Sequence, residues 1–418
     1  MLKHSFNRVS VIGLGYIGLP TAAILASRGV KVVGVDINQT AVDTINKGKV
    51  HIVEPGLDVV VQSVVSTGHL RAVTSPEPAE AFIMAVPTPF KEDYAPDLRY
   101  VEAATRSISK VLKKGDLVIL ESTSPVGTTE MMLQWIGETR PDLKLPNPLT
   151  GEPGDLAIAY CPERVLPGHV MRELIENDRV VGGVSPMCTA RAKELYKIFV
   201  SGDCVASNAK TAEMVKLTEN AFRDVNIAFA NELSMICEKI GINVWELISL
   251  ANRHPRVKIL QPGPGVGGHC ISIDPWFIVH KNPEEARLIR TARQVNDSKP
   301  HFVVDKVLKT VKSSGKKRIA CLGLAFKADI DDLRESPSVE IVKHLSTNSA
   351  LTLFAVEPYV ERLPEELSNK LNVRLVDSRT AILEAEIVLV LTNHRQFIEL
   401  DRSLLQEKVV IDTRGIWQ

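Results

Sequence analysis

The sequence predicts an α/β protein with two doubly wound, parallel-sheet domains, joined by a long central helix and a helical middle domain. Strand-like and helix-like runs alternate through the first third of the 418 residues and again from about residue 315 to the end, as in parallel sheets with crossover helices. Between these blocks, residues 211–240 have apolar side chains at helical spacing and no proline. We therefore expect domains over 1–205, 206–305 and 306–418.

The first block opens with an uncharged run, residues 9–27, about as long as a membrane-spanning helix. Three glycines and Pro20 interrupt it, so we interpret it as a buried strand and helix and expect no membrane association. The expected N-terminal elements are a strand over 8–15, a helix over 16–29, a strand over 31–37, a helix over 41–48, and strands over 81–87 and 115–122. The second block begins at 316–327 and continues with strands over 351–358, 386–393 and 408–415.

Composition indicates an ordinary globular protein, 44% hydrophobic and 24% charged. Lysine plus arginine equals aspartate plus glutamate at 50 each, so no nucleic-acid partner is expected and any anion site must be local. The six cysteines form no C-x-x-C pair and no zinc-ligand spacing. We expect no bound metal and a reducing, cytoplasmic location.

The turn after the first strand has the spacing of a dinucleotide-binding site. Gly13, Gly15 and Gly18 form G-x-G-x-x-G between a strand and a helix, which lets a pyrophosphate approach the backbone and the helix N-terminus. Asp36 ends the next strand, where a carboxylate can accept hydrogen bonds from a ribose. Because residues 37–39 offer no cation for a 2′-phosphate, the sequence favours NAD over NADP.

Hydroxyl groups follow two later strands of the same block. Thr88 lies in 85–90, and Ser122, Thr123, Thr128 and Thr129 lie in 121–130. Ligands of doubly wound sheets bind beyond the carboxyl ends of strands, so Thr88 is placed to contact the cofactor. Each hydroxyl in 121–130 fits a helix N-cap equally well.

Residues 263–276, GPGVGGHCISIDPW, bring a thiol into a glycine-rich segment. The glycines are expected to let the backbone pack closely against a ligand that Cys270 then reaches. Asp274 follows four residues later, on the same face if the segment is helical. The alternative is that Cys270 is a small buried hydrophobic residue. His269 has no second ligand at a suitable spacing and is not expected to bind metal.

The long helix carries Lys216, Asn220 and Arg223 at spacings of four and three, which places them on one face. An amide between two cations suits an anionic, oxygen-rich ligand. A solvated helix face would explain the two cations but not the apolar residues around them.

Six motifs occur in an order that resembles the UDP-glucose/GDP-mannose dehydrogenase family over essentially the whole chain. They are GLGYIGLP, AVPTPF, STSPVGTT, EMVKLTENAFRDVNIAFANE, GPGVGGHC followed by an aspartate, and GLAFKADIDDLRESP. The resemblance implies two Rossmann-like domains and oxidation of a sugar C6 alcohol to a carboxylate with two NAD per sugar. CPERVLPG, NRHPRVKILQPGPGVGGHC and DPWFIV resemble bacterial members that oxidise UDP-N-acetyl-D-mannosamine for surface polysaccharide such as enterobacterial common antigen.

The resemblance also implies roles for individual residues. Cys270 matches the nucleophile, which forms a thiohemiacetal and then a thioester. Lys216 and Asn220 match the residues at the reacting oxygen, while Asp274, Glu163 and Thr123 match residues near the hydrolytic water. The implied NAD contacts are Gly13, Gly15, Tyr16, Ile17, Gly18, Asp36, Thr88, Thr129 and Arg334. The implied sugar-nucleotide contacts are Arg164, Val165, Lys216, Asn220, Arg223, Gly267, Phe326, Lys327 and Arg414, with His254 and Arg256 in a loop that completes the partner's site in a homodimer.

Three positions depart from the UDP-glucose branch of the family. His269 stands for a serine, Ile273 for a lysine, and Pro167 for a second glutamate. These changes favour the N-acetylmannosamine branch. Four other activities stay open: 6-dehydrogenases of UDP-glucose, of UDP-N-acetylglucosamine or of a GDP-sugar, and a two-electron β-hydroxyacid dehydrogenase that needs no cysteine. A cofactor-binding protein without activity would leave Cys270, Lys216 and Asp274 without a shared purpose.

Overall fold

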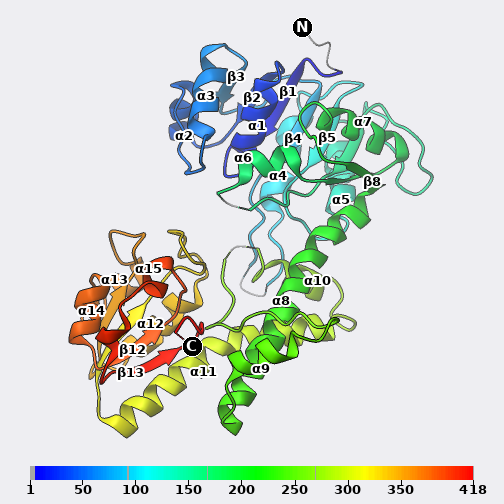
Figure 1. Ribbon diagram of the computed structural model, residues 1–418. Coiled ribbons are helices and arrows are strands. Elements are labelled where there is room, and N and C mark those ends of the chain that lie inside the picture. Colours follow the sequence, from blue (N-terminus) through cyan, green and yellow to red (C-terminus); the bar gives the residue numbers. More distant parts are fainter. Residues whose placement is uncertain (1–4, 92–93, 167, 269, 418) are drawn as a thin grey trace. The chain divides into compact units, whose positions relative to one another are not determined.

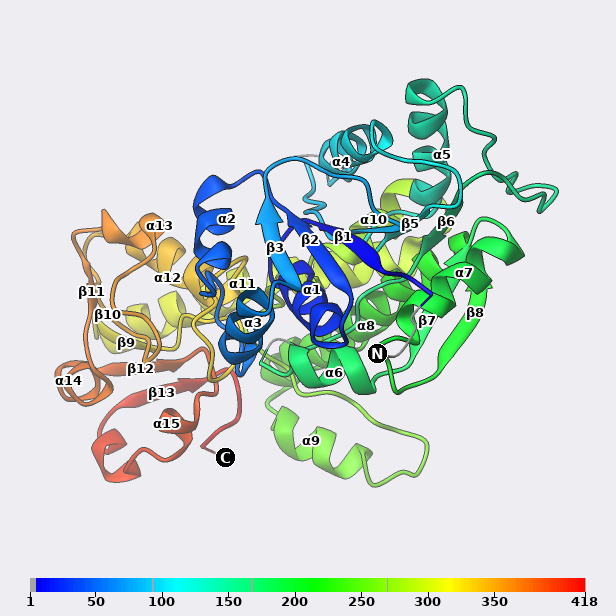
Figure 2. The ribbon, with the colours of Figure 1, turned by 90° about the horizontal axis from the view of Figure 1, so that it is seen from above.

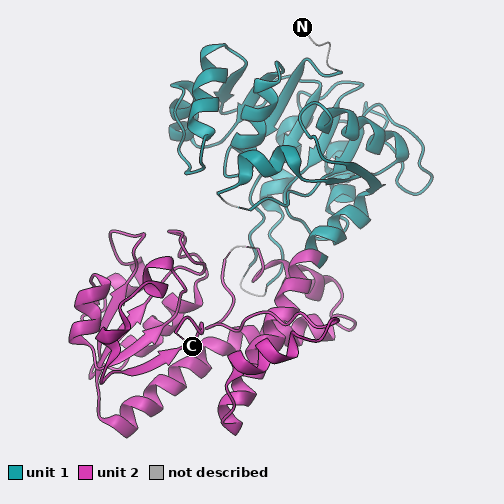
Figure 3. Cartoon of the chain, in the orientation of Figure 1, with its two compact units in different colours: residues 1–218 teal, residues 219–418 magenta. Residues whose placement is uncertain are grey.

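The computed structural model describes residues 5–91, 94–166, 168–268 and 270–417 (Figure 1). The chain forms two compact units, Met1–Thr218 and Glu219–Gln418, whose boundary falls within one long helix (Figure 3).

The first unit is built on an eight-stranded sheet with the order β3-β2-β1-β4-β5-β6-β7-β8. Neighbouring strands are parallel except β6 and β7, and the order 3-2-1-4-5-6 is that of a doubly wound dinucleotide-binding sheet. β1, β2 and β3 lie side by side in Figure 2. The strands are β1 Arg8–Ile12, β2 Lys31–Val35, β3 Leu70–Val73, β4 Ala81–Met84, β5 Leu117–Leu120, β6 Ala157–Tyr160, β7 Arg179–Gly183 and β8 Cys204–Asn208.

Central strands of this sheet are buried along their whole length, as expected where helices cover both faces. β4 and β5 carry AFIM and LVIL without an exposed residue. The helices of the unit are α1 Gly18–Ser27, α2 Gln39–Asn46, α3 Leu57–Ser66, α4 Arg99–Ser109, α5 Thr128–Thr139, α6 Val170–Glu176 and α7 Pro186–Tyr196. The uncharged run 9–27 thus forms β1 and α1. Within the described residues, no helix is both long and apolar enough to cross a membrane.

The long central helix is α8, Ala209–Ile240, close to the predicted span of 211–240. In the second unit it is followed by α9 Val244–Ala251, α10 Asp274–Lys281 and α11 Arg287–Ser314. The sequence did not predict α11, which contains Pro300 at an interior position that usually ends a helix.

A second parallel sheet, with the order β11-β10-β9-β12-β13, completes the second unit and repeats the 3-2-1-4-5 arrangement. Two apolar clusters form its core. Its elements are β9 Arg318–Leu322, α12 Pro337–Ser346, β10 Thr352–Val356, α13 Glu365–Ser368, β11 Val373–Leu375, α14 Ser378–Glu384, β12 Ile387–Val390, α15 Arg395–Ile398, η1 Arg402–Leu405 and β13 Val409–Asp412. The predicted class, two doubly wound sheets joined by a long helix, is confirmed.

Candidate active site

The glycine-rich turn between β1 and α1 has the geometry that its spacing predicts. Gly13 adopts φ +89°, and its N–H donates to the Val35 carbonyl at 2.8 Å. A Cβ on Gly18 would lie 1.8 Å from the Gly13 oxygen, so only glycine permits this approach of helix to turn. Around Gly15 the space is open, and Tyr16 beside it is 50% exposed.

Asp36 lies at the mouth of this turn. Its carboxylate accepts from the Leu14 N–H and the Asn38 N–H, both at 2.9 Å, and the side chain is only half-buried. α1 starts at Gly18 after Ile17, which gives no side-chain cap. The Leu19 N–H donates to the Gly15 carbonyl at 3.1 Å and Pro20 has no N–H, so an anion would bind at the first residue of the helix and the turn before it. An open glycine turn, an uncapped helix N-terminus and a fixed carboxylate fit the pyrophosphate and adenosine ribose of NAD.

Thr88 and Thr123 are brought together at the ends of neighbouring strands β4 and β5. The Thr88 hydroxyl donates to the Thr123 carbonyl at 2.6 Å, and both residues are half-buried. The two predicted positions therefore share one edge of the sheet, where ligands of such sheets bind.

Thr129 is fully buried, and both of its donors are engaged by Glu213. The Glu213 carboxylate accepts from the Thr129 N–H at 2.8 Å, the Thr129 hydroxyl at 2.6 Å and the Gly127 N–H at 2.6 Å. Glu213, at the start of α8, thus caps the N-terminus of α5. Burial raises the pKa of Glu213. An acidic residue within an apolar stretch of helix is the sequence feature that hints at this contact.

Glu163, which follows β6, is held by a buried arginine that the sequence did not single out. The Arg179 guanidinium lies 2.6 Å from Glu163, and their side chains are 3% and 9% exposed. The other Glu163 oxygen accepts the Arg164 N–H at 2.6 Å. The Arg164 side chain donates to the Asp178 carbonyl, and Val165 packs against the core. Pro167 lies outside the described residues.

Glu121, Cys161 and Tyr196 complete this polar cluster behind Glu163. The Tyr196 hydroxyl donates to Glu121 at 2.6 Å, and the Arg179 guanidinium stacks 5.3 Å from the Tyr196 ring centroid. Burial raises the pKa of Glu121 to about 7 despite the attraction of Arg179. Burial likewise raises the pKa of the Cys161 thiol to about 12, so this cysteine is an inert structural residue.

Three predicted residues on α8 differ in their surroundings. Lys216 is half-buried and Arg223 is exposed. Asn220 is buried in the second unit, where its amide donates to the Asp274 carboxylate at 2.5 Å. Asp274 is the first residue of α10 and is 2% exposed, so this bond fixes the start of α10 against α8.

Cys270 is exposed, unlike Cys161, Cys188, Cys237 and Cys321, which are buried. It begins a turn that leads into α10, because its carbonyl accepts from the Ile273 N–H at 3.1 Å and the Asp274 N–H at 2.9 Å. The predicted helical relation of Cys270 to Asp274 is confirmed. The thiol segment therefore leads directly into the N-terminus of α10, whose first residue is Asp274. His269 lies outside the described residues.

The glycines before Cys270 pack against the chain itself. A Cβ on Gly267 would lie 2.4 Å from the Glu335 carbonyl oxygen, and one on Gly268 would lie 2.7 Å from the Phe326 ring. Gly268, at φ +84°, donates its N–H to the Arg334 carbonyl at 3.3 Å. The space that these glycines provide is filled by protein atoms, and this seats the thiol segment on the turn after β9.

Phe326, Lys327 and Arg334 all belong to that turn, while Arg414 follows β13. Lys327 and Arg334 are exposed, and the Arg334 guanidinium pairs with Asp332 at 2.7 Å. Arg414 donates to the Leu391 carbonyl at 3.0 Å, and burial lowers its pKa to about 10. Arg414 and Phe326 are in contact range of the glycine segment, since a Cβ on Gly263 would lie 2.7 Å from the Arg414 guanidinium.

The turn after β9 repeats the geometry of the first unit with a different outcome. Gly323 has φ +95°, and Glu357 at the end of β10 accepts from the Leu324 and Ala325 N–H groups at 2.7 and 2.8 Å. His394, fully buried, lies 3.1 Å from the same Glu357 oxygen. Its Nδ1 accepts the Asp329 N–H, so Nε2 carries the proton that Glu357 accepts.

His254 and Arg256 lie in an exposed loop after α9 that is pinned at both ends. The Asn252 side chain donates to the Ile259 carbonyl at 3.0 Å and accepts its N–H at 2.7 Å.

Comparison with known proteins places the chain in a family. Three domains of the UDP-glucose/GDP-mannose dehydrogenase family match it in order. The NAD binding domain matches residues 7–200, the central domain matches residues 210–298, and the UDP binding domain matches residues 320–418. The chain belongs to the UDP-glucose/GDP-mannose dehydrogenase family. It is therefore an NAD-dependent nucleotide-sugar dehydrogenase by family.

Curated relatives that are 58–63% identical to this chain carry two kinds of name. A UDP-N-acetyl-D-mannosamine dehydrogenase of Campylobacter jejuni is 63% identical over 398 residues, 95% of this chain and 98% of the relative. An NDP-N-acetyl-D-galactosaminuronic acid dehydrogenase of Ralstonia solanacearum is 61% identical over 416 residues, 100% of this chain and 97% of the relative. The solved UDP-D-ManNAc dehydrogenase of Pyrococcus horikoshii is 39% identical, with a TM-score of 0.86 over 98% of this chain and 96% of that one.

Proposed function

We propose that this chain oxidises the C6 alcohol of UDP-N-acetyl-D-mannosamine to the carboxylate of UDP-N-acetyl-D-mannosaminuronic acid, with Cys270 as the nucleophile. The observation that carries the proposal is the exposed Cys270 thiol on the turn into α10, next to the buried Asn220–Asp274 pair. The 63% identity to a relative named for this substrate supports the choice of sugar.

Cys270 divides the oxidation into steps that are individually easier. When bound, NAD⁺ supplies the hydride acceptor for both oxidations. The Cys270 sulfur adds to the aldehyde carbon of the first product, and the carbonyl oxygen takes up a proton to give a thiohemiacetal. Loss of a hydride and a proton converts this to a thioester. Water then breaks the C–S bond, which releases the carboxylate and returns the thiol.

The roles of the surrounding side chains follow their chemistry. Lys216 and Asn220 would stabilise negative charge on the reacting oxygen. Asp274, Glu163 and Thr123 would orient the hydrolytic water. The remaining proposed contacts are those to NAD by Gly13, Gly15, Tyr16, Ile17, Gly18, Asp36, Thr88, Thr129 and Arg334, and those to the nucleotide sugar by Arg164, Val165, Arg223, Gly267, Phe326, Lys327 and Arg414.

Counting NADH per sugar tests the mechanism. We expect two NADH for each UDP-N-acetyl-D-mannosamine consumed by the purified protein, and no carboxylate from Cys270→Ser. A yield near one, or full activity in Cys270→Ser, would contradict the four-electron route and favour a two-electron dehydrogenase.

The second candidate substrate is the galacto-configured 2-acetamido sugar, since a relative at 61% identity is named for its uronic acid. A panel of UDP-N-acetyl-D-mannosamine, UDP-N-acetyl-D-galactosamine, UDP-N-acetyl-D-glucosamine and UDP-glucose decides between them. The largest kcat/KM should belong to the manno sugar; a larger value for any other sugar replaces our assignment.

We further propose that the enzyme acts as a homodimer. Phe222, Phe229 and Ile236 recur every seven residues along α8 and are 68%, 51% and 48% exposed, which is costly for an apolar stripe in water. A second copy of α8 would cover it, and the exposed His254–Arg256 loop would complete the partner's site. Phe229→Lys should therefore shift the mass in sedimentation equilibrium to that of one chain, whereas an unchanged mass would exclude this face.

The three-part division at 1–205, 206–305 and 306–418 is proposed to separate NAD binding, dimerisation and UDP-sugar binding. The product would serve cytoplasmic synthesis of a bacterial surface polysaccharide of the enterobacterial common antigen type. A strain lacking this protein should lose the uronic acid from that polymer and recover it when the gene is returned.

A further inference from the structure

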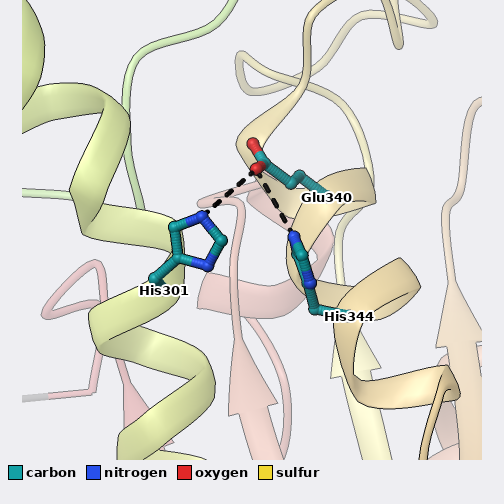
Figure 4. Close-up of side chains that lie close together, drawn as sticks. All are labelled: His301, Glu340 and His344. Atoms are coloured by element: carbon teal, nitrogen blue, oxygen red, sulfur yellow. Dashed lines mark ion pairs between the residues drawn. The ribbon is translucent and has the colours of Figure 1, made fainter.

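Two histidines and a glutamate meet on the surface where α11 and α12 pack together. His301 projects from α11, while Glu340 and His344 project from successive turns of α12 (Figure 4). The Glu340 carboxylate oxygen Oε1 lies 3.9 Å from His301 Nε2 and 3.6 Å from His344 Nε2. The ligand atoms of all three residues lie within 4.8 Å of one another. Within the described residues, they are the one group of histidine, cysteine or acidic side chains placed closely enough to hold a metal ion.

The fold explains why these side chains converge. Glu340 and His344 are four residues apart and therefore share one face of α12. His301 faces them from α11, and the two imidazole rings lie edge to face with their centroids 4.7 Å apart. No sequence pattern links His301 to the other two, because about forty residues separate them.

We propose that His301, Glu340 and His344 form a three-ligand site for Zn²⁺. Three ligand atoms about 3.6 Å apart are each about 2.1 Å from an ion at their centre, which matches zinc–nitrogen and zinc–oxygen bonds of about 2.0–2.2 Å. The Glu340–His344 contact is at this spacing at 3.6 Å, the Glu340–His301 contact is at 3.9 Å, and no two of the three ligand atoms lie more than 4.8 Å apart. Rotation of the exposed side chains would close the remaining gaps. Two imidazoles and one carboxylate suit zinc and its neighbours in the transition series rather than Mg²⁺ or Ca²⁺.

The exposure of the three side chains, 58%, 45% and 42%, lets an ion enter from solvent and leaves a fourth position for water. An ion pair between Glu340 and protonated histidines is the alternative explanation. Pairs this exposed contribute little to stability, so they give no strong reason for two imidazoles to share one carboxylate.

The site lies beside the residues that seat the thiol segment. Pro300 precedes His301, and Pro337 begins α12 one turn before Glu340. A Cβ on Gly265 would lie 2.8 Å from Pro337 and 3.2 Å from Pro300, so Gly265 packs against both helices. Zinc bound here would cross-link α11 to α12 and keep Pro300 and Pro337 packed against Gly265. The ion would stabilise the fold and take no part in the oxidation.

Zinc titration against a chromogenic chelator tests the site. The exposed Cys270 thiol could itself bind zinc, so every variant is made in the Cys270→Ser protein. We expect one Zn²⁺ per chain and a rise in melting temperature with zinc. His344→Ala and His301→Ala should each weaken binding by about tenfold or more, and His51→Ala, an exposed histidine of the first unit, should leave it unchanged.

Melting temperatures measured without zinc distinguish a metal site from a cluster that only stabilises the fold. We expect His344→Ala and the parent to melt at the same temperature without zinc and to differ only when zinc is present. Equal zinc affinity in the parent and His344→Ala, or no binding by the parent, would overturn the proposal. A lower melting temperature of His344→Ala without zinc, together with unchanged zinc affinity, would identify the cluster as an ion pair.

Discussion

Replacing Glu121 with glutamine should make the stability of the first unit less sensitive to pH. The Glu121 side chain is 2% exposed and accepts the Tyr196 hydroxyl at 2.6 Å through one oxygen. Its other oxygen is buried without a hydrogen-bond partner among the described atoms. Arg179 is paired with Glu163 close by, so burial dominates and raises the pKa of Glu121 to about 7. Glutamine keeps the shape and the acceptor but cannot ionise.

The size of the effect follows from the two pKa values. The difference between the ordinary pKa of 4.5 and a pKa of about 7 corresponds to about 3 kcal/mol. Because the folded-state pKa is the higher one, protonated Glu121 favours the folded state. That contribution is complete below pH 4.5 and is lost as the pH rises through 7. For a unit of about 200 residues, about 3 kcal/mol corresponds to roughly 6–12 °C in melting temperature.

Calorimetry of wild type and Glu121→Gln at pH 5 and pH 8.5 measures this directly. The melting transition to follow is the one that NAD⁺ shifts to higher temperature. That transition reports unfolding of the first unit, which carries the glycine turn. The variant minus wild-type difference in melting temperature should rise by several degrees between the two pH values. The same comparison for exposed Glu152→Gln should show no such rise. A difference for Glu121→Gln that stays constant with pH would refute the reasoning that a buried, ionisable Glu121 penalises the folded state.

Three further changes have expected outcomes. Asp36→Asn should weaken NAD⁺ binding about 10- to 100-fold in calorimetric titration, the value of a charged hydrogen bond, and equal affinity would remove Asp36 from the ribose site. Gly268→Ala should cost about 1–3 kcal/mol in denaturant melts because Phe326 occupies the Cβ position, whereas Gly29→Ala, at a similar φ but in open space, should cost less. Lys299→Met should stabilise the protein by up to about 3 kcal/mol at pH 7, because burial lowers the lysine pKa from 10.5 to about 8. That gain should fade between pH 8 and 10.5, and a gain that is equal at pH 7 and pH 10.5 would contradict the assigned cause.

Features encoded by neighbouring residues were predictable from the sequence. The buried strands and the glycine turn obey local patterns, and the predicted 31–37 and 386–393 contain β2 and β12. The position of Asp36 beside the glycine turn could be predicted, because Asp36 follows a strand that runs beside β1 in a parallel sheet. The relation of Cys270 to Asp274 needed only a helical turn.

Contacts that close over long stretches of chain left no local signal. Glu213 reaches Thr129 over 84 residues, and Arg179 meets Glu163 from another strand. The glycines before Cys270 have the composition of a ligand loop, yet Phe326 fills the space beside Gly268. Glycine permits close approach, but only the fold decides what approaches.

The two doubly wound sheets show why the same turn can have different uses. In both units the turn glycine donates to the end of the neighbouring strand at 2.8 Å, and an acid follows that strand. Asp36 accepts one N–H at each oxygen and stays half-exposed, so lone pairs remain for ribose hydroxyls. Glu357 is enclosed: burial opposes its ionisation, but bonds from His394 and the backbone hold its pKa below the ordinary value.

The enclosed Glu357 therefore cannot accept hydrogen bonds from a ribose unless it gives up its bond from His394. His394 is fully buried and would then be left with an unpaired N–H. The nucleotide contacts that we propose in the second unit, Phe326 and Lys327, lie outside this carboxylate. An acid at the end of the second strand thus indicates a dinucleotide site only where no buried base occupies it. His394→Leu should destabilise the second unit, because Glu357 loses a buried hydrogen-bond partner. We expect no second NAD⁺ site in this variant, because removing the base leaves the Glu357 carboxylate enclosed. A second NAD⁺ bound per chain in that variant would mean that His394 alone excludes the cofactor.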